Sequence, residues 1–79
     1  MSTTKSVKLQ LNAKGAWKDV CRFDIVDAQA TAHIMEAAAT IATYATDKPS
    51  ARIVTADAHS LPLMHWDSDK GWKPWGNAL

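Results

Sequence analysis

The sequence predicts a small α+β domain in which one helix covers one face of a four-stranded antiparallel sheet. Three observations predict this class: two N-terminal segments that alternate apolar and polar residues, one long alanine-rich amphipathic segment, and two short apolar segments after it. The element order is β-β-α-β-β. With the third strand beside the first, the strand order is 2-1-3-4 and the helix makes a right-handed crossover. A chain of 79 residues forms one domain, residues 1–79.

The first two strands are predicted as a hairpin over residues 5–11 and 17–25, with Gly15 supplying the positive φ of the turn. The first strand has three apolar residues on one side: Val7, Leu9 and Leu11. The alternation of the second strand predicts four inward residues: Trp17, Cys21, Phe23 and Ile25. Asp19 would also face inward, so there is either a β-bulge near it or a frayed sheet end where its carboxylate reaches solvent.

The helix is predicted over residues 28–46. Asp27 is a good N-cap, and Pro49 cannot continue a helix. One helical face carries the residues expected to pack on the sheet: Ala30, Ile34, Ala38, Ile41 and Ala45. Because most of them are alanine, the helix backbone can lie close to the sheet.

The third and fourth strands are predicted over residues 51–56 and 61–66. Pro62 has no N–H to donate, which places the fourth strand at a sheet edge. Residues 67–79 carry glycine and proline without a period and are predicted to form an extended tail that contains tryptophan. A single helix covers only one face of four strands, so the other face meets solvent, a partner or this tail.

Composition and charge exclude several classes of protein. The net charge of +1 gives no strong global field that would attract nucleic acid or anionic lipid. Cys21 is the single cysteine, so it forms no intramolecular disulfide, and we interpret it as a small buried residue. The alanine-rich segment is too polar to span a membrane, and no apolar leader opens the sequence. These features predict a cytoplasmic protein.

Two groups of residues are candidates for binding a partner. Strands one and two are expected to place basic side chains on the open sheet face: Lys8, Lys18 and Arg22, with Gln10, Val20 and Asp24. The second group is tryptophan, a residue type enriched at interface hot spots: Trp66, Trp72 and Trp75. Two alternatives stay open, because the charges also fit an ordinary solvated surface and the tail tryptophans could instead cover the chain's own sheet.

A metal site and an enzyme site have weaker support in the sequence. Five residues near the C-terminus are ligand types for a divalent cation: Asp57, His59, His65, Asp67 and Asp69. Their spacing does not distinguish a metal site from a turn. No convergent acid, base and nucleophile set is present, so neither a catalytic activity nor a cofactor is predicted.

These observations favour a noncatalytic protein–protein interaction module, with nucleic-acid binding by the basic N-terminal hairpin as the alternative. An edge strand and an open face also permit a homodimer. The compact chain, with Ser6–Leu11 (SVKLQL) and 15–20 (GAWKDV), resembles the small orphan proteins of bacteriophages and prophages, anti-CRISPR-type inhibitors among them. This resemblance of size and strand–helix plan implies a stoichiometric inhibitor that occludes a site on a larger host complex. A second kind of inhibitor would mimic nucleic acid with the acidic helix surface that carries Glu36 and Asp47. The positive charge of the N-terminal hairpin argues against this kind.

Overall fold

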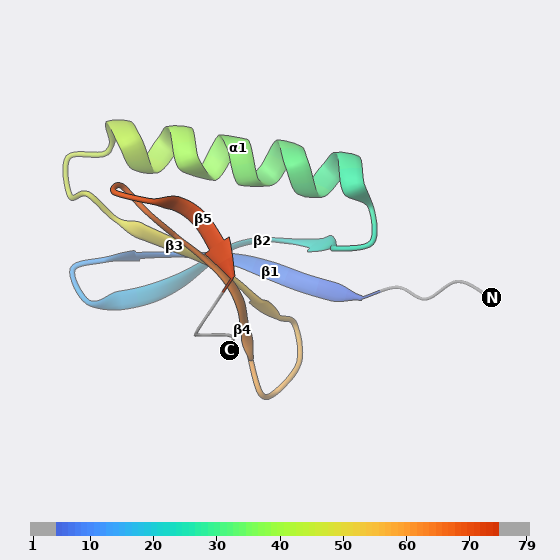
Figure 1. Ribbon diagram of the computed structural model, residues 1–79. Coiled ribbons are helices and arrows are strands. Elements are labelled where there is room, and N and C mark those ends of the chain that lie inside the picture. The colour runs from blue at the N-terminus through green and yellow to red at the C-terminus, as the bar shows by residue number, and fades with distance from the viewer. Residues whose placement is uncertain (1–4, 75–79) are drawn as a thin grey trace.

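The computed structural model describes residues 5–74, which form one antiparallel sheet with a helix over one of its faces (Figure 1). The elements are β1 Ser6–Ala13, β2 Ala16–Asp24, α1 Ala28–Tyr44, β3 Ser50–Thr55, β4 Pro62–Asp67 and β5 Gly71–Pro74. The strand order is β2-β1-β3-β4-β5. The α+β class and the order of the first four strands are therefore confirmed, whereas the prediction of only four strands is wrong.

The fifth strand lies in the segment expected to be an extended tail. A tight turn precedes it, in which the Asp67 carboxylate accepts the N–H groups of Asp69 at 2.9 Å and Lys70 at 2.8 Å. Gly71 follows with φ at +74°, a conformation that glycine adopts without strain. The turn brings Trp72 opposite Trp66, and β5 completes the sheet. The missed strand is only four residues long, too short for an alternating pattern to reveal it.

β4 therefore has a neighbour on each side, and the prediction that Pro62 places it at an edge is wrong. Pro62 is the first residue of β4 and lies opposite Val54 of β3. β5 pairs only with 64–67, so no strand on that side needs an N–H from residue 62. Proline at the first position of a strand is compatible with an interior strand for this reason.

The helix begins and ends close to its predicted bounds. The Asp27 carboxylate accepts the N–H of Ala30 at 3.0 Å, which confirms the N-cap. Ala38 and Ala42 are buried against the sheet. Ile41, which was expected on the same face, is 56% exposed. It lies three residues after Ala38, at the flank of the buried stripe, because successive helical residues rotate by about 100°.

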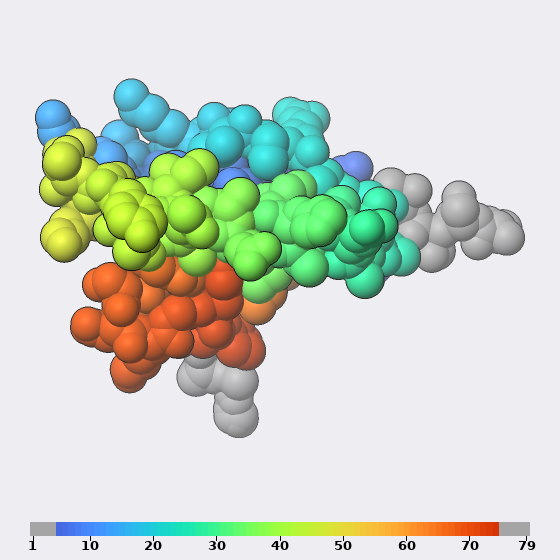
Figure 2. Space-filling view, turned by 90° about the horizontal axis from the view of Figure 1, so that it is seen from above, coloured from blue at the N-terminus to red at the C-terminus, as the bar shows by residue number. Residues whose placement is uncertain are grey.

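The core lies between α1 and the sheet. Seen from above the helix, the β1–β2 hairpin extends to one side of α1 and the β4–β5 hairpin to the other (Figure 2). Around the buried alanines of the helix, the sheet contributes Val7, Leu9, Ala51, Ile53 and Trp66. Phe23 and Ile25 pack against this cluster, as their predicted inward position requires.

β2 contains a β-bulge, which decides the faces of its side chains. Leu9 of β1 pairs with Cys21, and the next residue, Gln10, pairs with Asp19, so Val20 is the inserted residue. A bulge shifts the alternation of the strand by one residue. Of the two explanations for Asp19, the bulge is confirmed, and this carboxylate lies on the sheet face away from the helix.

Two predicted orientations in β2 are wrong because of its bulge, and one predicted burial is wrong because β2 is an edge strand. Trp17 pairs with Asn12 and lies away from the helix, whereas Lys18 pairs with Leu11 and lies on the helix side. Cys21 is exposed although it lies on the helix side. It belongs to the edge strand, and the helix runs over the middle of the sheet (Figure 2).

Candidate functional site

The sheet face away from α1, which we call the open face, carries most of the polar side chains of the sheet. One register row crosses all five strands on this face: Asp19, Gln10, Arg52, His65 and Lys73. Neighbouring strands lie about 4.8 Å apart, so adjacent members of this row are within reach of one another. The row places the Asp19 carboxylate at the β2 end, and the cationic side chains of Arg52 and Lys73 on β3 and β5.

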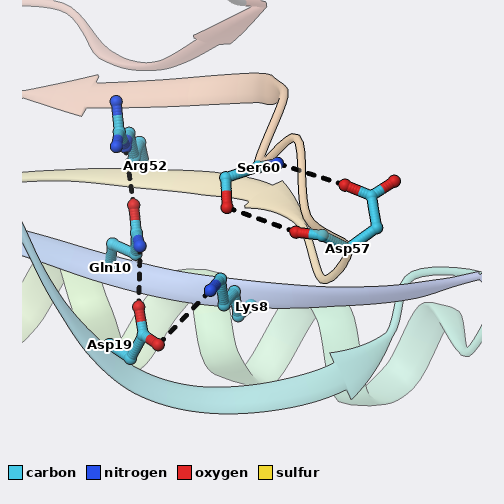
Figure 3. A network of polar contacts seen from close by, with 6 residues as sticks. All are labelled: Lys8, Gln10, Asp19, Arg52, Asp57 and Ser60. Atoms are coloured by element: carbon cyan, nitrogen blue, oxygen red, sulfur yellow. Dashed lines mark hydrogen bonds and ion pairs between the residues drawn. The ribbon is translucent and has the colours of Figure 1, made fainter.

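Five residues form a continuous set of contacts, the open-face network of Lys8, Gln10, Trp17, Asp19 and Arg52. The amino group of Lys8 lies 3.3 Å from one Asp19 oxygen, and Gln10 Nε2 donates to the other at 2.7 Å. Arg52 Nε donates to Gln10 Oε1 at 2.8 Å (Figure 3). The Arg52 guanidinium also lies 4.0 Å from the centre of the Trp17 ring. The network therefore links three neighbouring strands from β2 to β3.

Gln10 holds the network together. It is 7% exposed although it lies on the open face. Its amide oxygen faces a donor on Arg52 and its amide nitrogen faces an acceptor on Asp19. Only one orientation of the amide satisfies both, because a flipped amide would place donor against donor and acceptor against acceptor. Gln10 thus fixes the Arg52 side chain relative to the Asp19 carboxylate.

The electrostatics of the network keep Asp19 ionised. The hydrogen bond from Gln10 makes the largest contribution to lowering the pKa of Asp19. The hydrogen bond from Lys8 and the charges of Lys8 and Arg22 lower it further, against an opposing effect of burial. Partial burial lowers the pKa of Arg52, but an arginine stays charged in proteins. The open face therefore presents fixed charges of both signs at neutral pH.

The lysines and arginines of the open face differ in how they are neutralised. Lys8 lies against Asp19, and the amino group of Lys73 lies 3.6 Å from an Asp67 oxygen. Arg22 is exposed and sits opposite Lys8, and neither it nor Arg52 forms an ion pair with a residue in 5–74. The two guanidinium groups are therefore the cations of this face that an external anion could neutralise.

The structure separates the predicted partner-binding residues. Lys8 and Arg22 lie on the open face as expected, whereas Lys18 does not. Trp66 is 6% exposed and belongs to the core. Trp72 packs against the core, and its indole N–H donates to the Met35 carbonyl at 2.9 Å. Of the two alternatives for the tail tryptophans, Trp72 therefore follows the second: it packs on the chain's own fold. Trp75 lies outside the described residues.

Sequence reasoning missed Trp17 and Arg52 as surface residues. Arg52 alternates with the apolar residues Ala51 and Ile53, so its outward position was readable from the strand pattern. An unbroken alternation through residues 17–25 predicts that Trp17 faces inward, but the bulge at Val20 interrupts it. The signal for the bulge was Asp19, whose predicted inward position conflicted with its charge.

Two aspartates near the C-terminus, Asp57 and Asp67, use their carboxylates in turns. No group of three or more histidine, cysteine or acidic side chains within residues 5–74 is arranged to hold a metal ion. Asp57 accepts hydrogen bonds from the Thr55 hydroxyl at 2.8 Å and from the N–H groups of His59 and Ser60. The Thr55 hydrogen bond is the largest cause that lowers the pKa of Asp57, so this carboxylate stays ionised in its turn. The Ser60 hydroxyl also donates to the Asp57 carbonyl (Figure 3).

Residues 5–74 line surface hollows at two places that bear on a site. One, of about 250 Å³, lies between the end of α1 and the β4–β5 turn. The other, of about 510 Å³, lies beside the start of β1 and is lined by Lys5, Ser6 and Asp57 among others. The Asp57 carboxylate is already engaged in its turn. Neither hollow lies on the open-face network.

Comparison with known proteins does not place this chain in a family: no family model, curated protein or solved structure matches it. In the part of the chain that the structure describes, α1 is too short and too weakly apolar to cross a bilayer.

Proposed function

We propose that this protein is a noncatalytic protein–protein interaction module that binds its partner with the open face. The observation that carries this proposal is the stack of Arg52 on Trp17 at 4.0 Å, held on a sheet face that the helix does not cover. Tryptophan and arginine are the residue types most enriched at interface hot spots. A partner that docks on this face meets both at once.

The rigidity of the open face supports the same proposal. Its polar side chains are tied to three neighbouring strands, and among the described residues no buried side-chain nitrogen or oxygen lacks a hydrogen bond. A satisfied polar network holds one arrangement of side chains. Binding then requires little ordering of these groups, and less conformational entropy is lost on association.

The mixture of charges favours a protein over a nucleic acid. A phosphate backbone is bound by several cations that replace its counterions. Here Lys8 and Lys73 are each held by an aspartate, and those carboxylates would repel a nearby phosphate. Nucleic-acid binding remains the alternative, supported by the adjacency of Lys8 and Arg22. Arg52 already lies over one face of the Trp17 ring, so that face is not available to stack on a base.

The biological role that we propose follows the resemblance to small phage inhibitors. The protein acts in the cytoplasm by occupying a site on a larger complex, in stoichiometric amounts and without chemistry. Occlusion needs only a rigid surface that matches its target in shape and charge, and the restrained polar side chains of the open face support this proposal.

Capture of a partner with open-face variants tests the proposal. Tagged wild-type protein is passed through bacterial lysate, with and without nuclease, beside a Trp17→Ala/Arg22→Gln variant and a Lys18→Gln control. We expect a nuclease-resistant protein that the wild type and the control retain and the open-face variant loses. Retention of nucleic acid that is lost at high salt would support the alternative instead. A partner retained equally by all three would show that the open face is not the binding surface.

A further inference from the structure

The Arg52 guanidinium has an unused hydrogen-bonding edge. A guanidinium carries five N–H donors, and among residues 5–74 the only hydrogen bond of this group runs from Arg52 Nε to Gln10 at 2.8 Å. No residue within 5–74 accepts a hydrogen bond from its two terminal nitrogens. A ring stacked on a guanidinium occupies the face of the group and leaves the N–H donors in its plane available. The Trp17 contact therefore leaves this edge open.

Two contacts fix the direction of this edge. The Trp17 ring restrains the plane of the guanidinium, and Gln10 restrains its rotation in that plane. Gln10 is itself held by Asp19, which Lys8 contacts at 3.3 Å. A free arginine side chain has many rotamers, and most of that freedom is lost whenever it binds a ligand. In this protein the freedom is already restricted before the ligand arrives.

We propose that Arg52 is a preorganised receptor for a carboxylate, and that the partner inserts a glutamate or aspartate side chain against its terminal nitrogens. The two parallel N–H donors of the guanidinium fork match the two oxygens of a carboxylate. This inference rests on the proposed function and names the chemistry of its partner: an acidic protein surface with one carboxylate at the centre of the contact.

The surroundings of Arg52 favour a carboxylate over a phosphate. Asp19 lies in the same register row one strand beyond Gln10, and 56% of its side chain is exposed. A phosphate monoester carries about 1.5 to 2 negative charges at neutral pH and is repelled more strongly by that aspartate than a singly charged carboxylate. A carboxylate also needs only one fork, whereas tight phosphate binding uses several cations.

A peptide titration tests the receptor without knowledge of the partner. The probe is a six-residue peptide that alternates glutamate with glycine, beside the same peptide with glutamine and beside inorganic phosphate. Nitrogen–proton NMR spectra report the Arg52 Nε–H and the amide of Gln10. We expect saturable shifts at both with the glutamate peptide, and none with the glutamine peptide. Equal shifts with the glutamine peptide, a stronger response to phosphate, or no shift at millimolar peptide would overturn the proposal.

The variant Arg52→Lys tests whether the carboxylate is bound by the fork of the guanidinium or by its positive charge alone. Lysine keeps the positive charge but has no fork, so the glutamate-peptide affinity should fall about tenfold, the usual scale of a lost charge-assisted hydrogen bond. Trp17→Ala should weaken the affinity for the glutamate peptide several-fold. The guanidinium keeps its hydrogen-bond donors, but the ring that restrains its plane is lost. Lys18→Gln, on the other face, is the control for a general charge effect. Equal weakening by Lys18→Gln and Arg52→Lys would contradict a specific receptor.

The captured partner distinguishes failure of this inference from failure of the proposed function. If a protein is captured through the open face and Arg52→Lys binds it as tightly as the wild type does, the receptor is wrong while the binding module stands. If the glutamate peptide binds at Arg52 but no protein depends on the open face, the receptor stands alone and the proposed function is wrong. Far-UV circular dichroism of each variant confirms that it is folded.

Discussion

The two faces of the sheet are stabilised by different physical forces. The helix-covered face is held by apolar burial, with Ile53 fully buried and Trp66 6% exposed. The open face buries one apolar side chain, Val54, opposite Lys8, and differs in its directional contacts, which run from Lys8 through Asp19 and Gln10 to Arg52. Burial is tolerant of side-chain orientation, whereas a hydrogen-bonded network fixes it. The comparison indicates that the helix side specifies the fold, and the open face is the surface that we propose for recognition.

Replacing a tryptophan by alanine should lower the free energy of unfolding by very different amounts on the two faces, and this is the largest effect that we expect. Trp66→Ala removes a buried core side chain and should cost about 3–5 kcal/mol, much of the stability of a domain this small. Trp17→Ala removes a half-buried ring and a cation–π contact worth about 1 kcal/mol. Urea unfolding followed by circular dichroism measures both. Similar losses for the two tryptophans would contradict the division between the faces.

The next effect concerns Gln10 at the centre of the network. Gln10→Ala leaves the Arg52 Nε and one Asp19 oxygen without their partner, and a lost partner of this kind costs about 1–3 kcal/mol. Thr40→Ala is the control, since its hydroxyl bonds a carbonyl of its own helix and is exposed. The free energy of unfolding should fall clearly more for Gln10→Ala. A loss no larger than that of Thr40→Ala would show that the network is incidental to stability.

A smaller effect is expected where β5 joins the helix. Trp72→Phe keeps an aromatic ring but loses the hydrogen bond to the Met35 carbonyl, which should cost about 1 kcal/mol. The thermal unfolding midpoint measures it. Trp72→Phe should leave partner capture unchanged, since Trp72 packs on the helix side. If the variant is folded but no longer captures the partner, Trp72 belongs to the binding surface.

The smallest effect is the response of the open face to acid. Since the folded-state pKa of Asp19 is lowered, its contribution to stability is present above the unfolded-state pKa of about 4 and is lost as pH falls through the lower folded-state value. Gln10→Ala should raise the pKa of Asp19 toward its ordinary value, because the Gln10 hydrogen bond is the largest cause of the shift. Carboxyl-carbon NMR over the acid range measures it. An unchanged titration in the variant would assign the shift to Lys8 and Arg22 instead.

The sequence predicted the part of the fold that depends on regular periods. The hairpin, the helix with its Asp27 cap and the order of the first four strands follow from alternation and capping. The bulge at Val20 was suspected but not placed, because an inserted residue has no period of its own. β5 was missed because its four residues contain proline and glycine and are paired by tertiary contact with β4.

The candidate site was predicted only in part, for the same reason. Lys8 and Arg22 were placed on the open face because their strands were correctly recognised. Trp17 and Lys18 were interchanged between the faces, since one inserted residue reverses every assignment beyond it. The contacts of Arg52 with Gln10 and Trp17 join residues far apart in sequence, and a single sequence gives no signal for such pairs.

Dissociation constants for the captured partner test the central claim most directly. They are compared for the wild type, Arg52→Gln on the open face and Lys18→Gln on the helix side, two variants that remove the same charge. We predict that Arg52→Gln binds about tenfold more weakly or worse, as loss of a charge-assisted hydrogen bond requires, while Lys18→Gln stays within about twofold. An Arg52→Gln variant that binds as the wild type does, or a larger loss with Lys18→Gln, would contradict the assignment of recognition to the open face.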